Sequence, residues 1–172
     1  MKIQKWVLAL FVIGLTGTVR AETGKVTLVG TSTSTVVSGV ALLWDTPQGL
    51  KIDADITQAP AGLHGLHIHE FGLCDEQGKA AGGHYNPAGH PHGNTLKDGI
   101  AKTHAGDFAN VTIDKTGKGS LHIVVPGLAL SQGPTPVAGH ALVLHEKADD
   151  FSQPTGNAGG RIGCGAIVIT GK

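Results

Sequence analysis

Apolar and polar residues alternate along most of the chain with a period of two, which is typical of half-buried β-strands. The segments with this pattern are residues 26–29, 36–43, 52–56, 66–69, 109–113, 120–125, 141–145 and 166–170. A turn at residues 114–117 separates two of these segments and predicts a β-hairpin. No stretch has a convincing amphipathic helical pattern. The alternation therefore predicts an all-β sandwich or barrel of roughly eight strands.

Two segments follow no period. Residues 71–106 are rich in Gly, His and Pro, and residues 147–163 are equally irregular. Irregular segments of this length in a compact domain usually carry function. We therefore expect two functional loops on one β-domain, and no internal repeat or linker divides the chain.

The first 21 residues have the features of a secretory signal peptide. Lys2 and Lys5 precede an almost wholly apolar run at 6–15, and a small-residue cleavage signal ends at Ala21. The alternative is a membrane anchor, but a spanning helix needs about 20 apolar residues. We expect cleavage near Ala21, a mature domain of residues 22–172 without a membrane span, and a periplasmic or secreted location.

Composition supports a folded domain and gives no sign of nucleic-acid binding. Of 172 residues, 40% are apolar and only 15% are charged, which is too apolar for a disordered chain. Gly and Pro make up about a fifth of the chain, which favours turns and ordered loops over long helices. The 13 basic and 13 acidic residues cancel. Without the leader, ten basic and 13 acidic residues remain, a formal net charge of −3.

The only two cysteines are Cys74 and Cys164. In the reducing cytosol both would stay free thiols, but an exported protein enters a compartment in which disulfides persist. An exported chain can therefore carry a disulfide between them.

Histidine is the unusual residue, with ten in the chain and seven between residues 64 and 104. His67 and His69 are two apart in one predicted strand, so they share its outer face while the alternating apolar residues face the core. His145 faces outward from another strand and could complete a metal site with them. A single outward histidine would indicate only a surface residue, but a His-x-His pair before a His-rich loop favours metal binding.

A second ligand set follows in the first irregular segment. His84, His92, His104 and Asp107 supply three imidazoles and one carboxylate, which is a suitable tetrahedral zinc set. A loop with so few apolar residues also needs a metal or similar cross-link to order it.

The remaining histidines have simpler interpretations. We expect His64, at the start of its strand, to be a hydrogen-bonded structural residue. His90 is a solvated loop residue, and His122 and His140 are residues on strand surfaces.

Five segments, in order, resemble the copper/zinc superoxide dismutase family. They are HGLHIHEFG at 64–72, GGHYNP at 82–87, HAGD at 104–107, the segment 139–150 that contains LHEKADD, and GNAGGRIGCG at 156–165. The resemblance covers nearly all of residues 24–170. Any single His-x-His would be weak evidence, whereas the ordered set is specific.

The resemblance implies an eight-stranded Greek-key β-barrel or sandwich with a long metal-binding loop and a short active-site loop. It assigns copper to His67, His69, His84 and His145, and zinc to His84, His92, His104 and Asp107, with His84 bridging both metals. It places Arg161 beside copper to hold the anion, Asp149 between His67 and His92, and a disulfide between Cys74 and Cys164. The implied reaction converts two superoxide anions and two protons to dioxygen and hydrogen peroxide, through alternate reduction and oxidation of copper.

The chain departs from animal-type members in one loop. Only residues 151–155 separate Asp150 from Gly156, so the charges credited with guiding superoxide have no counterpart there. The early position of Cys74 and the leader resemble bacterial periplasmic members. Family interfaces differ between the two types, which leaves a homodimer open.

Two other functions remain as alternatives. A copper carrier on the same fold typically lacks copper ligands or the arginine, and a structural β-sandwich with one zinc would leave His67, His69 and His145 unexplained.

Overall fold

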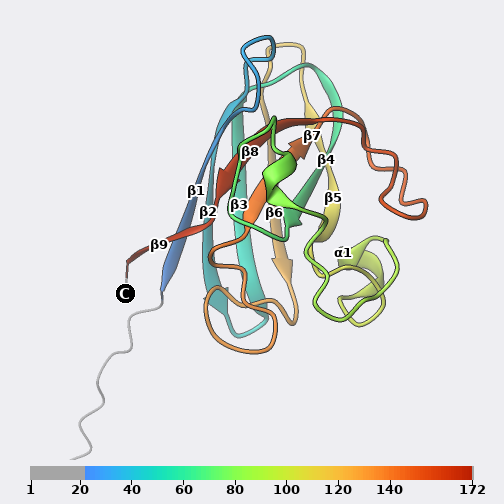
Figure 1. Ribbon diagram of the computed structural model, residues 1–172. Helices are drawn as coiled ribbons and strands as arrows, with labels where there is room; N and C mark the ends of the chain where they lie inside the picture. Colours follow the sequence, from blue (N-terminus) through green and yellow to red (C-terminus); the bar gives the residue numbers. More distant parts are fainter. Residues whose placement is uncertain (1–21, 172) are drawn as a thin grey trace, which may run out of the picture.

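The computed structural model describes residues 22–171, so the predicted signal peptide at 1–21 lies outside the described residues. These residues form a β-domain with almost no helix (Figure 1). Its strands are β1 (Thr23–Gly30), β2 (Ser38–Thr46), β3 (Gly49–Gln58), β4 (Gly62–His69), β5 (Asp107–Ile113), β6 (Gly119–Val125), β7 (Ala141–His145), β8 (Arg161–Ala166) and β9 (Val168–Gly171). Two short helices, η1 (Lys79–Ala81) and α1 (Thr95–Asp98), lie in the first irregular segment.

The strands form a nearly closed antiparallel barrel. Their order is β5-β4-β7-β8-β1-β2-β3-β6, and β9 pairs with β1 beyond the end of β8. β3 and β4 follow each other in the chain but are not neighbours, because β6 lies beside β3 and β7 beside β4. This crossing is the Greek-key arrangement, so the predicted eight-stranded barrel is confirmed.

The predicted hairpin at 109–125 is wrong in its pairing. The turn is present, since the Asp114 amide donates to the Lys118 carbonyl at 2.8 Å. However, β5 pairs with β4 and β6 pairs with β3, so the two strands lie at opposite ends of the hydrogen-bonded order. A turn residue pattern fixes the chain reversal, whereas the strand pairing depends on the whole barrel.

β8 begins inside the segment that was predicted to be an irregular loop. Gly163 and Gly165 interrupt its alternation, and both are needed for close packing. A Cβ at Gly163 would lie 2.7 Å from the Val37 side chain, and one at Gly165 would overlap the Thr27 carbonyl oxygen. The barrel wall therefore requires glycine where the sequence pattern suggested a loop.

The core follows the predicted alternation. Leu66 and Ile68 of β4 and Leu144 of β7 pack inside the barrel, while His67 and His69 lie on the opposite face of β4. The outer face of β4 is nevertheless shielded from solvent, since both histidines are fully buried. Within residues 22–171, no helix reaches the length and apolar character needed to span a membrane.

Loops cover this outer face and explain its burial. The Gly65 amide donates to the Lys147 carbonyl at 2.9 Å, and the Glu70 amide donates to the Gly83 carbonyl at 2.9 Å. These bonds hold both irregular segments beside β4, on one side of the barrel (Figure 1). A disulfide between Cys74 and Cys164 joins the first segment to β8, as the family resemblance implied.

Candidate metal centre

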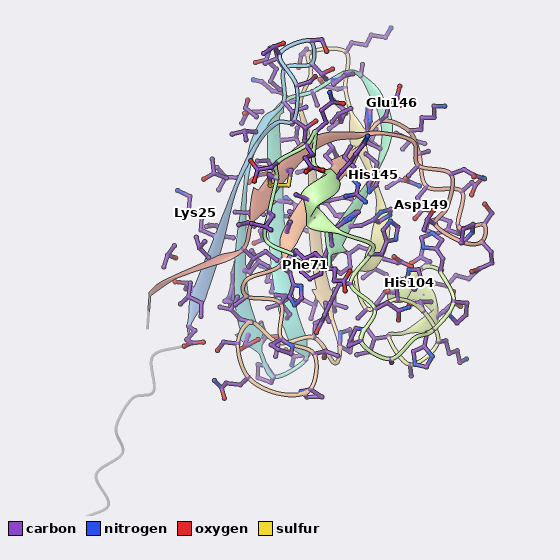
Figure 2. The ribbon with its side chains drawn as sticks, in the orientation of Figure 1. Lys25, Phe71, His104, His145, Glu146 and Asp149 are labelled. Carbon is purple, nitrogen blue, oxygen red and sulfur yellow. A yellow bond between two sulfur atoms is a disulfide. The ribbon has the colours of Figure 1, made fainter. Side chains whose placement is uncertain are left out.

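Four histidines converge on the outer face of the barrel. His67 and His69 come from β4, His145 ends β7, and His84 comes from the covering loop. One potential ligand atom from each lies within 4.8 Å of the others. His145 lies beside the covering loops, whereas Lys25 of β1 lies on the far side of the barrel (Figure 2). The structure therefore brings together all four residues of the predicted copper set.

Backbone carbonyls fix which nitrogen of His69 carries the lone pair. Its Nδ1 lies 3.1 Å from the Gly82 carbonyl oxygen, so Nδ1–H donates there and Nε2 is left as an acceptor. His145 Nδ1 lies 3.5 Å from the Gly159 carbonyl oxygen, and its Nε2 lies 3.1 Å from Nε2 of His69. The two Nε2 atoms therefore face each other across the site.

Burial keeps these two imidazoles neutral. Desolvation, together with the neighbouring histidines and Arg161, lowers the pKa of His69 to about 2 and that of His145 to about 3. Burial also lowers the pKa of His84, against the raising effect of its hydrogen bond to Asp107. Near pH 7 each of these neutral rings therefore has one nitrogen lone pair, which a soft or borderline cation can bind.

His67 presents an unpaired nitrogen to the same point. Its Nε2 donates to the Asp149 carboxylate at 2.8 Å, which leaves Nδ1 with a lone pair. That Nδ1 is buried and has no hydrogen-bond partner. A buried acceptor without a partner is costly, so this atom also fits a metal ligand.

The predicted zinc set also comes together. Asp107, at the start of β5, is fully buried, with its carboxylate 2.8 Å from His84 Nδ1, 2.6 Å from His92 Nδ1 and 3.0 Å from His104 Nδ1. Burial disfavours the charged carboxylate, but the hydrogen bonds from His104 and His84 and the close approach of His92 lower the pKa of Asp107 overall. A charged carboxylate with three imidazoles is a suitable donor set for zinc.

His92 has the clearest sign of a missing cation in this set. Its Nε2 lies 3.0 Å from Asp149 Oδ1, and its Nδ1 approaches Asp107 Oδ2 without the angle of a hydrogen bond. Desolvation would lower the pKa of His92, but the two carboxylates outweigh it and raise this pKa to about 9. The site therefore attracts a positive charge between His92 and Asp107, as a proton or as a metal ion.

Asp149 connects the two sets. Its Oδ2 accepts from His67 of the copper set, and its Oδ1 accepts from His92 of the zinc set. These bonds outweigh the cost of burial and lower the pKa of Asp149. A carboxylate on the far nitrogen of a ligating histidine fixes the tautomer and the orientation of the ring.

His84 belongs to both sets of ligand atoms. Its Nδ1 faces Asp107, so the nitrogen on the other edge of the ring, Nε2, is left for the four-histidine set. The ring also lines a hollow of about 170 Å³ with His69, His145, Gly159 and Arg161. The four-histidine set is thus open to small molecules, whereas the zinc set is buried beneath the loops.

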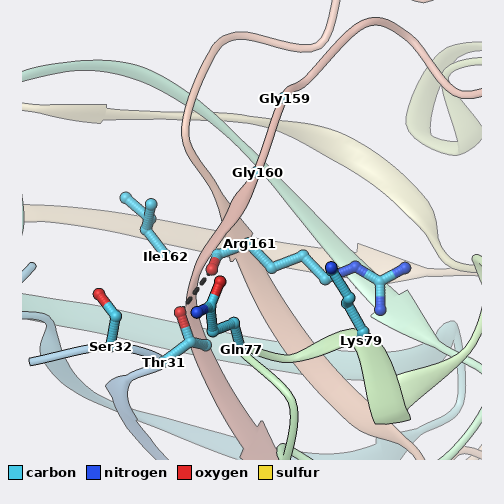
Figure 3. A pocket seen from close by; sticks show the side chains of 8 residues that line it. All are labelled: Thr31, Ser32, Gln77, Lys79, Gly159, Gly160, Arg161 and Ile162. Atoms are coloured by element: carbon cyan, nitrogen blue, oxygen red, sulfur yellow. Dashed lines mark hydrogen bonds between the residues drawn. The ribbon is translucent and has the colours of Figure 1, made fainter.

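Arg161 lies on the wall of that hollow, at the start of β8. Its guanidinium donates to the Gly78 and Gly82 carbonyls, both at 2.5 Å, and both belong to the loop that the disulfide ties to β8. The side chain also lines an adjoining hollow of about 320 Å³, together with Lys79 (Figure 3). Arg161 therefore lies on the wall of both hollows, and Lys79 on the wall of the second.

The other histidines behave largely as expected. His64 is buried, with ring nitrogens 2.8 Å from the His145 carbonyl oxygen and 2.9 Å from the Pro60 carbonyl oxygen, which confirms a structural role. His90 belongs to neither ligand set. His122 is exposed on β6 and faces Asp53. His140 differs, because it packs against Tyr85 and its Nδ1 donates to the Glu70 carbonyl at 2.7 Å.

Sequence reasoning missed three residues beside the centre. Lys79 was hidden in a segment without periodicity, although it lies five residues after Cys74. Asn110 and Gln153 hydrogen-bond to the main chains of Asp149 and His92, respectively. Contacts of this kind leave no signal in the spacing of ligands along the chain.

Comparisons with known proteins agree with this geometry. The family model for copper/zinc superoxide dismutase matches residues 23–167. The Cu-Zn superoxide dismutase of Deinococcus radiodurans is 38% identical over 165 residues, which cover 87% of this chain and 84% of that protein. The crystal structure of the clock protein EA4 matches with a TM-score of 0.75 and 34% identity, over 90% of this chain and 98% of that one.

The chain therefore belongs to the copper/zinc superoxide dismutase family. It is an oxidoreductase that uses copper and zinc to convert superoxide to dioxygen and hydrogen peroxide. This result favours the enzyme over the copper carrier and over the structural sandwich with one zinc.

Proposed function

We propose that His67, His69, His84 and His145 hold copper, that His84, His92, His104 and Asp107 hold zinc, and that His84 bridges the two ions. The observation that carries this assignment is the convergence of ligand nitrogens in the four-histidine set, with His84 shared between the two sets. The carboxylate belongs to the buried set and the open hollow to the all-histidine set. Copper in an open all-imidazole site and zinc in a closed site with a carboxylate match their ligand preferences.

Copper held by these four histidines would supply the one-electron redox chemistry that the conversion of superoxide to dioxygen and hydrogen peroxide requires. Zinc has a single valence. The residues of the chain then have three tasks: to admit a small anion, to orient it, and to supply protons to the product.

Arg161 admits and orients the anion. Its guanidinium is charged at all relevant pH values and is fixed by two backbone carbonyls, so it holds a small anion without losing a proton to it. Burial lowers the pKa of Arg161, but from a value far above neutrality. The arginine is thus an orienting group, and protons must come from elsewhere.

His84 is the proton carrier. Hydrogen peroxide forms when the second superoxide gains one electron and two protons. Nε2 of His84 lies on the ring edge opposite Asp107, at the hollow where the product forms. A proton would be held at Nε2 only while this nitrogen is not bound to copper, and it would then pass to the departing peroxide, while Nδ1 stays on the zinc side beside Asp107.

Metal reconstitution tests the assignment. The metal-free protein should take up one copper and one zinc per chain and remove superoxide only with copper present. His69→Ala should lose copper and activity but keep zinc. A variant that loses zinc and keeps copper would contradict the ligand sets.

We also propose that residues 1–21 direct export and are removed near Ala21. Support comes from the charged start, the apolar run and the small residues before the cleavage position. A disulfide in the folded domain fits an oxidising compartment. Amino-terminal sequencing of the protein from the periplasm or medium should begin at Glu22, and an intact leader in soluble cytosolic protein would contradict export.

A further inference from the structure

We propose that Asn110 and Gln153 are positioning residues that hold the Asp149 bridge between the two metal sites, and so tune the affinity of the zinc set. The proposal rests on the ligand assignment above. It concerns the main-chain positions of Asp149 and His92, the two residues whose side chains form the bridge on the zinc side.

Asn110 holds Asp149 through both of its main-chain groups. Its Nδ2 donates to the Asp149 carbonyl at 2.8 Å, and its Oδ1 accepts from the Asp149 amide at 2.6 Å. Because an amide N–H only donates and a carbonyl only accepts, this pair allows one orientation of the side chain. Asn110 therefore acts like a neighbouring strand and fixes Asp149, a loop residue, to β5.

Gln153 holds the other end of the bridge in the same way. Its Nε2 donates to the His92 carbonyl at 2.8 Å, and its Oε1 accepts from the His92 amide at 3.1 Å. The side chain of Gln153 is exposed, so it adds little to the core of the domain. Its visible contribution is to attach one irregular segment to the zinc ligand of the other.

The side-chain amides of Asn110 and Gln153 both support one chain of contacts, which runs from Asp149 through His92 to Asp107. Asp149 Oδ1 is 3.0 Å from His92 Nε2, and His92 Nδ1 is 2.6 Å from Asp107 Oδ2. A shift of either main chain would rotate the His92 ring away from the zinc position. Groups that orient a metal-ligating histidine typically affect metal affinity by 10–100-fold. We place these amides, which act through the main chain, near the lower limit.

Two substitutions of almost constant shape each remove the hydrogen bond that the side-chain NH2 group donates to a main-chain carbonyl. Asn110→Asp and Gln153→Glu keep an acceptor for the main-chain N–H but set a carboxylate oxygen against the carbonyl oxygen. We expect the zinc affinity of each to fall about tenfold, measured by competition with a chromogenic chelator. The absorption spectrum of Co²⁺ in the zinc site should change as well, because it reports ligand geometry rather than stability.

Asn86 supplies a matched control. It binds the His90 main chain with the same pair of bonds, at 2.9 and 3.0 Å, and His90 belongs to neither ligand set. Asn86→Asp should keep the wild-type zinc affinity and Co²⁺ spectrum. Since the side chain of Gln153 is exposed, Gln153→Glu also guards against a failure of Asn110→Asp to fold.

The outcomes separate the proposals. A loss of zinc affinity in both test variants, with Asn86→Asp unchanged, supports the positioning role. If wild type binds zinc and both test variants bind it equally well, the positioning role is wrong and the ligand assignment stands. An equal loss in the control also overturns the role, because any loop change would then suffice. If wild type fails to bind zinc, the ligand assignment itself is wrong.

Discussion

The Nε2 atoms of His69 and His145 lie 3.1 Å apart and face each other across the four-histidine set. The Nδ1 atoms of both rings face backbone carbonyls, at Gly82 and Gly159, and burial keeps both rings neutral near pH 7. This geometry fits a copper ion bound by neutral imidazoles of both residues.

Substitution of His145 should remove copper and leave zinc bound. In His145→Ala the copper set keeps three histidines, whereas the zinc set is untouched because His145 belongs only to the first. We expect elemental analysis to show zinc near one per chain, with copper and superoxide removal lost. His122→Ala, on an exposed strand surface, is the control and should keep both metals.

Gly156 should tolerate no side chain. Its φ is +71°, and a Cβ there would overlap the Asp149 carboxylate and lie 2.5 Å from His92 Nε2. Gly89 has a similar φ of +68° with nothing within 4 Å, so Gly89→Ala isolates the backbone penalty of about 1–2 kcal/mol. Gly156→Ala should lose a further 1–3 kcal/mol or so in denaturant unfolding, along with zinc affinity. Equal losses for the two variants would contradict the role of Gly156.

The disulfide should matter for stability and for Arg161. Cys74 and Cys164 are 90 residues apart, and their bond links β8 to the loop after β4. The carbonyls of Gly78 and Gly82 in this loop hold the Arg161 guanidinium. Removing a native disulfide typically lowers the free energy of unfolding by about 2–5 kcal/mol. Cys74→Ser should show such a loss and a lower rate at equal copper content. Two alkylatable thiols in the native protein would refute the bond.

Local charge should dominate the approach of superoxide. Residues 22–172 have a formal charge of −3, which repels an anion, but distant charges are screened beyond about 8 Å at physiological salt. Arg161 and Lys79 line the hollows at the site. The rate should therefore fall modestly as a non-coordinating salt is added, and Arg161→Ala should flatten or invert that slope. A wild-type rate that rises with salt would mean that global repulsion controls the encounter.

Much of the fold and of the candidate centre could be predicted from local sequence. His67 and His69 share a face because strand geometry has a period of two, and the same rule placed His145. The ligand set around Asp107 followed from residue types alone. These inferences depend on neighbours in the chain or on ligand chemistry, and both can be seen in a single sequence.

Other features depend on contacts between distant segments. β8 was missed because Gly163 and Gly165 serve packing against Val37 and Thr27, more than a hundred residues away in the chain. The hairpin prediction failed because β5 and β6 are the two edges of the nearly closed barrel and pair with β4 and β3 instead of with each other. Burial of His67 likewise depends on loops that no local pattern could place. Asn110 was overlooked because its partner, Asp149, is 39 residues away.

The most direct test of the central claim is whether one ring, that of His84, binds both ions. Zinc is diamagnetic, so the Cu(II) electron paramagnetic resonance signal of the copper-zinc protein should be that of an isolated ion. With paramagnetic Co²⁺ in place of zinc, exchange through the two nitrogens of a shared imidazolate should broaden or abolish that signal. An unchanged Cu(II) signal, with Co²⁺ shown to occupy the zinc site, would contradict the shared ligand.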